Sequence, residues 1–285
     1  MSRIAYVNGR YVPQSQACVG IEDRGFQFAD GVYEVCEVKR GQLVDEARHM
    51  ARLDRSLKEL RIAHPMPPQA LKVVMRETIR RNRLHDGIVY VQVTRGDTRR
   101  DFPFPPNGTP PTIVVTSRSH DLARIEAQAD KGIAVVTMPD IRWQRVDIKS
   151  VALLPNVLAK QAAKEQGARE AWLVDGNGFV TEGASSNAWI VTRDGALVTR
   201  PLGTGILPGI TRSVVRDLIA AEGLSFEERP FTVEAAYAAR AAFVTSASQS
   251  VMPVVEIDGR PVGNGAPGLV AGALRRGYHG QAAFS

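Results

Sequence analysis

One lysine and one glutamate stand in surroundings that suit covalent catalysis. Lys149 lies between an apolar and aromatic stretch, 141–146, and the apolar run 151–154. Desolvation by such neighbours disfavours the ammonium form, so that the neutral amine could attack an aldehyde. Glu182 is followed by small residues and could pair with a cationic ring nitrogen. Without a catalytic role, Lys149 would be a surface lysine beside a strand end, and Glu182 would lie in a turn with its carboxylate in solvent.

Two further segments could bind an anion such as a phosphate ester. The glycine-rich run 203–209 precedes a predicted helix, whose first turn offers free N–H groups and the Thr211 hydroxyl. A hydroxyl-rich turn, 245–248, follows a predicted strand and could form a second side of that site. Arg52, on another predicted helix, is either a phosphate clamp or a solvated charge. A simple helix N-cap at Thr211 and a plain polar turn stay open as alternatives.

The elements that must position these residues follow from hydrophobic periodicity. Short apolar runs predict strands at 4–7, 32–38, 88–94, 112–116, 133–138, 171–174, 188–192, 196–198 and 242–245. Helical spacing predicts helices at 46–62, 69–82, 156–166, 211–222, 233–239 and 268–278. The irregular order of these elements predicts an α+β fold rather than a repeating βαβ barrel.

The chain of 285 residues is long enough for one large or two modest domains. A domain boundary is expected near residue 120. We expect a small N-terminal domain at 1–119, an interdomain linker at 120–130 and a larger C-terminal cofactor domain at 131–285. Just before the boundary, the proline-dense segment 101–111 cannot form a helix or a central strand. It is either a surface connection or a loop that reaches toward a site.

Composition narrows the class of protein. With 44% hydrophobic and 23% charged residues, the chain is neither disordered nor collagen-like. It has no apolar run of the roughly 18 to 20 residues that cross a bilayer and no secretory signal, so we expect a cytoplasmic protein. Cys18 and Cys36 lack metal-like spacing, and we expect both to be reduced and buried, with no metal site. The net charge of +6 would suit a nucleic-acid-binding module, but the basic residues are dispersed and lack interleaved aromatics.

Seven motifs, taken in order, resemble the class IV (fold type IV) pyridoxal-phosphate aminotransferases, most closely the D-amino-acid transaminases. They are DRGFQFADGVYEV, HMARL, VYVQVTRG, DIKSVALLPNVLAKQAAKEQG, TEGASSN, ILPGITR and FVTSASQSVMPV. The resemblance implies a small α/β sandwich domain and a larger pseudo-barrel α/β domain. It also implies pyridoxal 5'-phosphate as cofactor, amino acid and 2-oxo acid substrates, and a homodimer whose active site the partner subunit completes. Neither nucleic acid nor a membrane is implied as a partner.

Individual residues match the functional positions of that family. Lys149 matches the catalytic lysine, which binds the cofactor covalently and moves the proton between substrate and cofactor. Glu182 matches the carboxylate that keeps the pyridine nitrogen protonated. The other cofactor-binding positions are matched by Arg52, Leu207, Ile210, Thr211, Ser246 and Ala247, with Leu207 on the ring face and the rest around the phosphate. Positions near the substrate are matched by Tyr33, Val35 and Tyr90.

The sequence departs from this family where the substrate carboxylate is bound. In D-amino-acid transaminases, a loop of the partner subunit carries an Arg-x-His pair that traps the carboxylate. Here Arg100 takes the arginine place and Phe102 stands where histidine is expected. Loss of the histidine hydrogen bond could cost roughly 1 to 3 kcal/mol. We predict weaker substrate binding, or a site that uses Arg99 as well.

Two other positions also depart from the pattern. Glu37 stands where the Bacillus-type enzymes have a lysine. Ala247 stands where a threonine hydroxyl usually meets the phosphate. Backbone N–H groups and the neighbouring hydroxyls of Ser246 and Ser248 could replace that contact.

The resemblance implies a ping-pong transamination from D-amino acids of the D-alanine type to a 2-oxo acid such as 2-oxoglutarate. Branched-chain L-amino-acid transaminase, aminodeoxychorismate lyase and (R)-amine transaminase are alternatives within the same fold. Branched-chain enzymes typically have a glycine two residues after the aromatic at Tyr33, where this chain has Val35, and lyases usually have a threonine-rich strand there. An amine transaminase stays open because Phe102 makes the carboxylate side more apolar.

Overall fold

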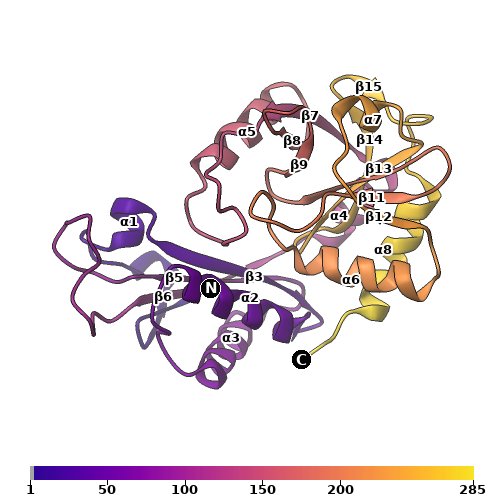
Figure 1. Ribbon diagram of the computed structural model, residues 1–285. Helices are drawn as coiled ribbons and strands as arrows, with labels where there is room; N and C mark the ends of the chain where they lie inside the picture. Colours follow the sequence, from indigo (N-terminus) through magenta and orange to yellow (C-terminus); the bar gives the residue numbers. More distant parts are fainter. Residues whose placement is uncertain (1–2) are drawn as a thin grey trace. The chain divides into compact units, whose positions relative to one another are not determined.

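The computed structural model describes residues 3–285, which fall into two compact units (Figure 1). The first unit holds the chain up to Asp121 together with Ile148–Ala152 and Ala283–Ser285. The second unit holds Leu122–Asp147 and Leu153–Ala282. Both units combine helices with a mainly antiparallel sheet, so the predicted α+β class is confirmed.

The first unit is built on a six-stranded sheet in the order β2-β1-β6-β5-β3-β4. Its strands are β1 (Ile4–Val7), β2 (Arg10–Pro13), β3 (Gly31–Lys39), β4 (Gln42–Leu43), β5 (Gly87–Thr94) and β6 (Thr112–Ser119). Its helices are the short α1 (Arg24–Phe28), α2 (Glu46–Glu59) and α3 (Pro68–Asn82), with a 3-10 turn at Gln14–Gln16. One face of the sheet packs on α2 and α3 through a core that includes Leu53, Leu57 and Met75 (Figure 1).

Side chains alternate along β3. Val32, Glu34, Cys36 and Val38 are buried, whereas the residues between them are partly exposed. Because successive strand residues point to opposite faces, Tyr33 and Val35 share the face that does not pack on the helices. The register of β5 places Tyr90 directly beside Val35. Strand geometry thus brings the three predicted pocket residues onto one face.

The second unit is built on a nine-stranded sheet in the order β12-β11-β10-β13-β14-β7-β8-β9, with β15 paired to β14. Its strands are β7 (Ile133–Pro139), β8 (Glu170–Val174), β9 (Val180–Gly183), β10 (Asn187–Val191), β11 (Leu197–Thr199), β12 (Phe226–Glu228), β13 (Ala241–Ser246), β14 (Ser250–Ile257) and β15 (Arg260–Pro261). Its helices are α4 (Leu122–Lys131), α5 (Leu154–Glu165), α6 (Ile210–Ala221), α7 (Val233–Tyr237) and α8 (Leu269–Gln281).

Both faces of this second sheet are covered, which explains its continuous apolar strands. Along β10, Ala188 and Ile190 join a core with residues of α4 and α7. The alternate residues Trp189 and Val191 join another core with α6 and α8. Burial on both faces favours unbroken apolar runs over strict alternation. The ends of these strands are therefore held rigidly, and polar residues placed there can be positioned well.

The structure differs from the expected domain division in two places. Most of the predicted linker, 120–130, forms α4, because Ile125 and Ala129 are spaced four residues apart and pack into the core of the second unit. Residues 148–152 and 283–285, predicted in the second domain, belong to the first unit. They do so through backbone pairing, with Ser285 bonded to Leu43 in both directions.

The two cysteines differ in burial. Burial, together with the charge of Glu34, raises the pKa of the Cys36 thiol well above its usual value. Cys18 is exposed, so the prediction that both are buried is wrong for Cys18, which follows a short 3-10 turn rather than lying in a strand.

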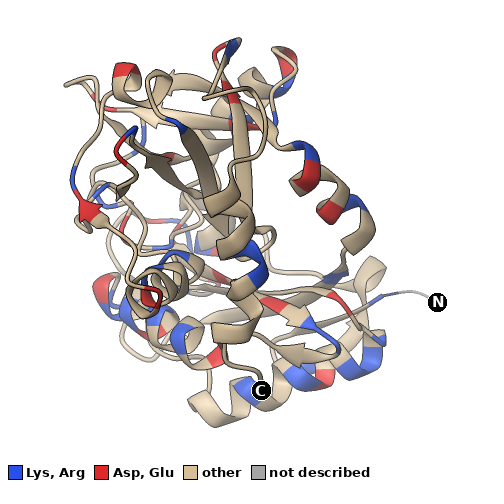
Figure 2. Cartoon of the chain, turned by 90° about the vertical axis from the view of Figure 1, so that its right-hand side faces the viewer, with Lys and Arg blue, Asp and Glu red and all other residues tan. Residues whose placement is uncertain are grey.

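Basic and acidic segments are interspersed along the described chain (Figure 2). On α3, for example, Glu77 pairs with both Arg80 and Arg81. Within residues 3–285, no helix has the length and apolarity needed to cross a membrane.

Candidate active site

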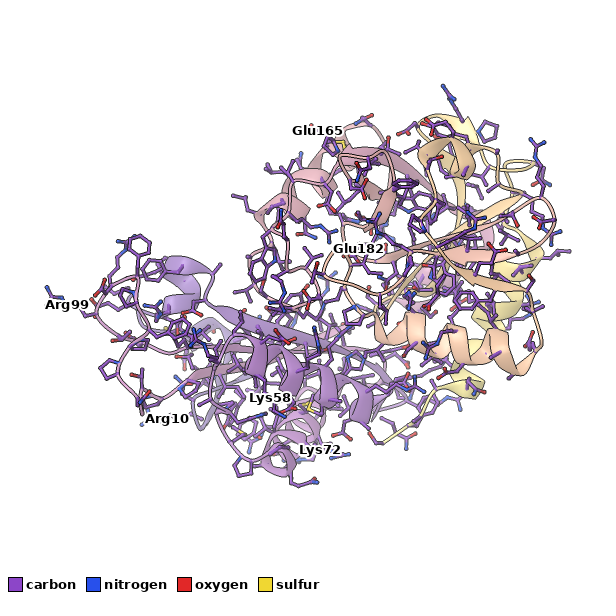
Figure 3. The ribbon with its side chains drawn as sticks, in the orientation of Figure 1. Arg10, Lys58, Lys72, Arg99, Glu165 and Glu182 are labelled. Carbon is purple, nitrogen blue, oxygen red and sulfur yellow. The ribbon has the colours of Figure 1, made fainter. Side chains whose placement is uncertain are left out.

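Glu182 lies on β9, a strand whose residues are all buried, and its carboxylate is held by three groups (Figure 3). Arg142 Nη1 donates to Oε1 at 2.5 Å, and Asn187 Nδ2 donates to Oε2 at 2.8 Å. The Leu207 N–H is shared between both oxygens at 3.1 Å. Donors on both oxygens favour the charged carboxylate and fix its orientation.

Arg142 extends this network away from Glu182. Its Nε and Nη2 donate to the two oxygens of Asp140 at 2.9 and 2.7 Å, and Asp140 also accepts from the Thr181 hydroxyl. Burial by itself lowers the pKa of Arg142, but the hydrogen bond to Asp140 and the charge of Glu182 raise that pKa above its ordinary value. Arg142 is therefore a permanent cation between two carboxylates.

Asn187 joins this network to the loop before α6. Its side-chain amide donates to Glu182 and also to the Leu207 carbonyl at 3.0 Å. A Cβ on Gly209 would lie 2.0 Å from Asn187 Oδ1, so this approach requires glycine. The predicted glycine-rich run thus brings the backbone of Leu207 and the start of α6 against the side chain of Asn187.

The start of α6 has the properties of an anion site. Gly209 precedes Ile210 and provides no side-chain cap for the helix. The Thr211 hydroxyl is buried and has no hydrogen-bond partner among residues 3–285. A buried hydroxyl without a partner is unfavourable, and a helix N-terminus attracts negative charge. A phosphate monoester would satisfy both groups, so these residues fit the phosphate that the resemblance implies.

The turn between β13 and β14 lies at the same end of the sheet. The antiparallel register places Asn187 of β10 opposite Thr245 of β13, one residue before Ser246. The Thr245 hydroxyl accepts from the buried Trp189 indole at 3.1 Å. Ser246 and Ala247 are partly exposed, so this turn can meet a ligand at the edge of the sheet.

Lys149 belongs to the first unit, where its backbone is fixed on both sides. Tyr33 N–H donates to the Lys149 carbonyl at 2.9 Å, and Lys149 N–H donates to Ser56 Oγ at 3.3 Å. Val151 N–H donates to the Gly31 carbonyl at 3.0 Å, so this segment pairs with the start of β3. The backbone that carries the lysine is therefore part of the sheet rather than a free loop.

The Lys149 side chain lies beside the predicted pocket residues. Its Nζ is 4.2 Å from the centre of the Tyr33 ring. The rings of Tyr33 and Tyr90 stack with their centres 5.5 Å apart. Burial, with a contribution from Tyr33, raises the pKa of Tyr90 to about 12, so that its hydroxyl stays protonated. This face of the first unit thus presents one lysine amine beside two tyrosine side chains.

Arg52 forms a buried ion pair that the sequence analysis does not predict. Its Nε and Nη2 donate to the two oxygens of Glu34 at 2.7 and 2.9 Å, and His49 Nδ1 lies 2.8 Å from the same carboxylate. Burial alone would raise the pKa of Glu34, but the charge of Arg52 and the hydrogen bond with His49 lower it to about 2. Strand alternation on β3 turns Glu34 toward α2, and this provides the signal for the pair.

Arg100 and Phe102 lie on the proline-dense loop after β5. No residue of 101–111 lies in a helix or a strand, as predicted. Both side chains are exposed, and Phe102 retains 78% of its accessible surface. The neighbouring Arg99 extends away from the loop into solvent (Figure 3).

The predicted site residues therefore form separate sets. Around Asn187 the second unit gathers Glu182, Leu207, Ile210, Thr211, Ser246 and Ala247. On one sheet face the first unit gathers Lys149, Tyr33, Val35 and Tyr90. Arg52 pairs on the opposite face of the same sheet, and Arg100 and Phe102 share a loop.

The sequence analysis did not single out Arg142 or Asn187. Asn187 closes the TEGASSN motif, so its position at the start of a strand was a usable signal. Arg142 stands in a stretch of alternating charge with no periodicity, and only the fold brings it to Glu182.

Comparison with known proteins identifies the family of the chain. The family described as "Amino-transferase class IV" matches residues 31–257. A D-alanine aminotransferase of Staphylococcus haemolyticus is 40% identical over 274 residues, 96% of each chain. One of Bacillus licheniformis is 41% identical over 261 residues, 92% of this chain and 90% of the other.

A solved structure shares the same fold. The branched-chain amino acid aminotransferase of Escherichia coli superposes with a TM-score of 0.89 and 25% identity, covering 98% of this chain and 94% of that one. The fold is thus fold type IV, as predicted. The chain belongs to the class IV aminotransferases, enzymes that depend on pyridoxal 5'-phosphate.

Proposed function

We propose that this aminotransferase transfers the amino group of D-amino acids, of the D-alanine type, to a 2-oxo acid such as 2-oxoglutarate. The observation that carries the proposal is the 40 to 41% identity to D-alanine aminotransferases over at least nine-tenths of each chain. The cycle is ping-pong, in which the first 2-oxo acid leaves before the second one binds and receives the amino group.

Lys149 supplies the amine that binds the cofactor and the base that moves the proton. The backbone bonds to Tyr33 and Ser56 fix the segment that carries the lysine, and a base fixed in this way would remove and return the substrate proton from one side. Pyridoxal 5'-phosphate, when bound, supplies the ring that accepts electrons as the substrate loses its α-proton. Tyr33, Val35 and Tyr90 line the substrate side.

In this proposal, the second unit provides the carboxylate for the ring nitrogen and the groups that bind the phosphate. Glu182, whose carboxylate accepts from Arg142 and Asn187, would pair with the ring nitrogen and favour its protonated form. The Ile210 N–H, the Thr211 hydroxyl and the turn at Ser246 and Ala247 would hold the phosphate. Leu207 would pack on the ring of the cofactor. Arg52, whose guanidinium is paired with Glu34, stays a proposed ligand of the phosphate.

We also propose a homodimer in the cytoplasm. Helix α5 leaves Leu154, Val157 and Leu158 more than half exposed, a stripe with the spacing of a helix face that suits a partner. The exposed loop of Arg100 suits a residue that is donated to a partner's site. Both cysteines are free thiols, as expected in a reducing compartment. Sedimentation velocity on the native protein and on Leu158→Glu tests the dimer, which the substitution should weaken.

Borohydride reduction of the holoenzyme tests the assignment of Lys149. Reduction fixes the cofactor to its lysine, and peptide mass spectrometry then identifies the modified residue. We expect the pyridoxyl group on Lys149 alone, and none on Lys160 or Lys164 of α5. Labelling at another lysine would contradict the assigned role.

Two alternative substrate classes have support of their own. The branched-chain aminotransferase of Escherichia coli shares the fold over nearly the whole chain, so an L-amino acid substrate fits the same architecture. An (R)-amine substrate is favoured by Phe102, which offers no hydrogen bond to a carboxylate. Parallel assays with D-alanine, L-leucine and (R)-1-phenylethylamine separate the three activities.

A further inference from the structure

In the part of the chain that the structure describes, Arg100 has no acidic partner, whereas Arg24 and Arg95 both pair with Asp30. Among residues 3–285 its contacts are with aromatic rings. The guanidinium carbon lies over the Phe28 ring at 5.0 Å from the ring centre and over the Phe102 ring at 5.9 Å. The carboxylate of Asp101, next in sequence, accepts instead from the Phe102 N–H at 2.8 Å.

The rings of Phe28 and Phe102 contact each other. Phe28 and Phe102 lie with their centres 5.4 Å apart. Phe28 ends α1, and its ring also lies under the Arg24 guanidinium at 4.8 Å.

Arg24 ties the loop to this pair through the backbone. It donates to the carbonyls of Asp101 and Phe102 at 2.6 and 3.2 Å, and its charge is balanced by Asp30 at 2.8 Å. The backbone that follows Arg100 is therefore held in place, although the Arg100 side chain is exposed.

We propose that Phe28 and Phe102 form an aromatic platform that positions Arg100 for the substrate carboxylate, in place of the histidine hydrogen bond. This inference rests on the proposed transamination of amino acids. A guanidinium held over a ring keeps its in-plane N–H donors available for a bidentate contact with a carboxylate. The platform also restricts a flexible side chain before the substrate arrives, which reduces the entropy lost on binding. Phe28 and Phe102 are thus positioning residues, and Arg100 contacts the substrate.

Kinetics of the holoenzyme with D-alanine test the platform. Cation–π contacts at exposed sites are weak, so Phe28→Leu and Phe102→Leu should each raise KM about two- to fivefold with kcat little changed. Arg100→Leu should raise KM by about tenfold or more, because it removes a charged hydrogen-bond donor. Phe102→Tyr, which keeps the ring, should restore the native KM.

A double-mutant cycle distinguishes positioning from a general loss of structure. If the rings act through Arg100, the leucine variants should have no further effect on KM in the Arg100→Leu background. Phe26→Leu is the matched control, because Phe26 is 75% exposed on the same helix and has no ring contact among the described residues. Phe102 is exposed, so its leucine variant should fold normally even where Phe28→Leu does not.

Two outcomes separate the platform from the proposed function. If the enzyme is active and both Phe28→Leu and Phe102→Leu have the KM of the native protein, the platform alone is overturned. The same holds if KM rises equally in Phe26→Leu. Absence of turnover with D-alanine in the unaltered protein would overturn the proposed function. In that case calorimetric titration with propionate still tests the platform, since the carboxylate should bind more weakly to the leucine variants, and equal binding would refute it.

Discussion

Arg142 donates a 2.5 Å hydrogen bond to Glu182, and both side chains are almost fully buried. A buried ion pair is sensitive to the loss of either partner, because the remaining charge is left uncompensated. The second carboxylate, Asp140, shares the same arginine. The ionisation of Glu182, on which the proposed chemistry depends, therefore rests on a residue that need not touch the cofactor.

Substitution of Arg142 should weaken catalysis through Glu182. In Arg142→Met we expect kcat/KM at neutral pH to fall roughly 10- to 100-fold, as when residues that orient metal ligands are removed. Without the cation, Glu182 stays protonated to higher pH, so the acid limb of the plot of kcat against pH should shift to higher pH. Arg200→Met is the control, since it breaks a comparable but partly exposed pair with Asp175. An unchanged acid limb in Arg142→Met would contradict the role.

The Thr211 hydroxyl should contribute to the affinity for the cofactor. Thr211→Val keeps the shape of the side chain and removes the hydroxyl, so Kd for pyridoxal 5'-phosphate should rise about tenfold. Ser213→Ala on the same helix is the matched control, because its hydroxyl donates to the Ile210 carbonyl. Equilibrium dialysis of the two variants measures the affinity without any turnover. Equal Kd values in Thr211→Val and the native protein would place the phosphate elsewhere.

Glu34 should contribute strongly to stability. Glu34→Gln leaves the Arg52 charge buried without its counter-ion, which should lower the free energy of unfolding by about 3 to 5 kcal/mol. Glu77→Gln, which removes an acid that pairs with two exposed arginines of α3, should change little. Urea unfolding of the three proteins measures the difference. A loss in Glu34→Gln no greater than in Glu77→Gln would show that the buried pair is not stabilising.

The same carboxylate predicts a pH dependence. Burial opposes its ionisation, but Arg52 and His49 lower the folded-state pKa to about 2. The resulting stability is present above the ordinary pKa of a glutamate and is lost as the pH falls toward 2. Between pH 6 and pH 3, protonation of Glu34 in the unfolded chain should lower the free energy of unfolding of the native protein by about 2 kcal/mol. The decrease in the free energy of unfolding over this pH range should be smaller by about 2 kcal/mol in Glu34→Gln. If the free energies of unfolding of the two proteins fell in parallel with pH, the lowered pKa of Glu34 would be refuted.

Elements with strong periodicity could be predicted from the sequence, and elements that depend on distant contacts could not. The strand at Ile4–Val7 and the helix at Pro68–Asn82 agree with the predictions within one residue. Helix α4 was missed because its surface is polar. Strand β14 was missed because Pro253 argues against a central strand, yet its pairing with β7 begins only at Val254.

For the site, too, local motifs could be predicted from the sequence, whereas contacts between distant residues could not. Lys149 and Glu182 could be singled out because local motifs surround them. The assignment of Lys149 to the first unit could not be predicted, since it depends on pairing with β3 over more than a hundred residues. The contact of Arg100 with Phe28 could not be predicted either, because the two residues are 72 positions apart.

The substrate specificity of the enzyme tests the central claim most directly. Purified holoenzyme is incubated with 2-oxoglutarate and either D-alanine, L-leucine or (R)-1-phenylethylamine, and chiral chromatography identifies the glutamate that is formed. The account predicts rapid turnover of D-alanine with D-glutamate as the product. Preferential consumption of L-leucine with L-glutamate as the product, or of the amine, would contradict it.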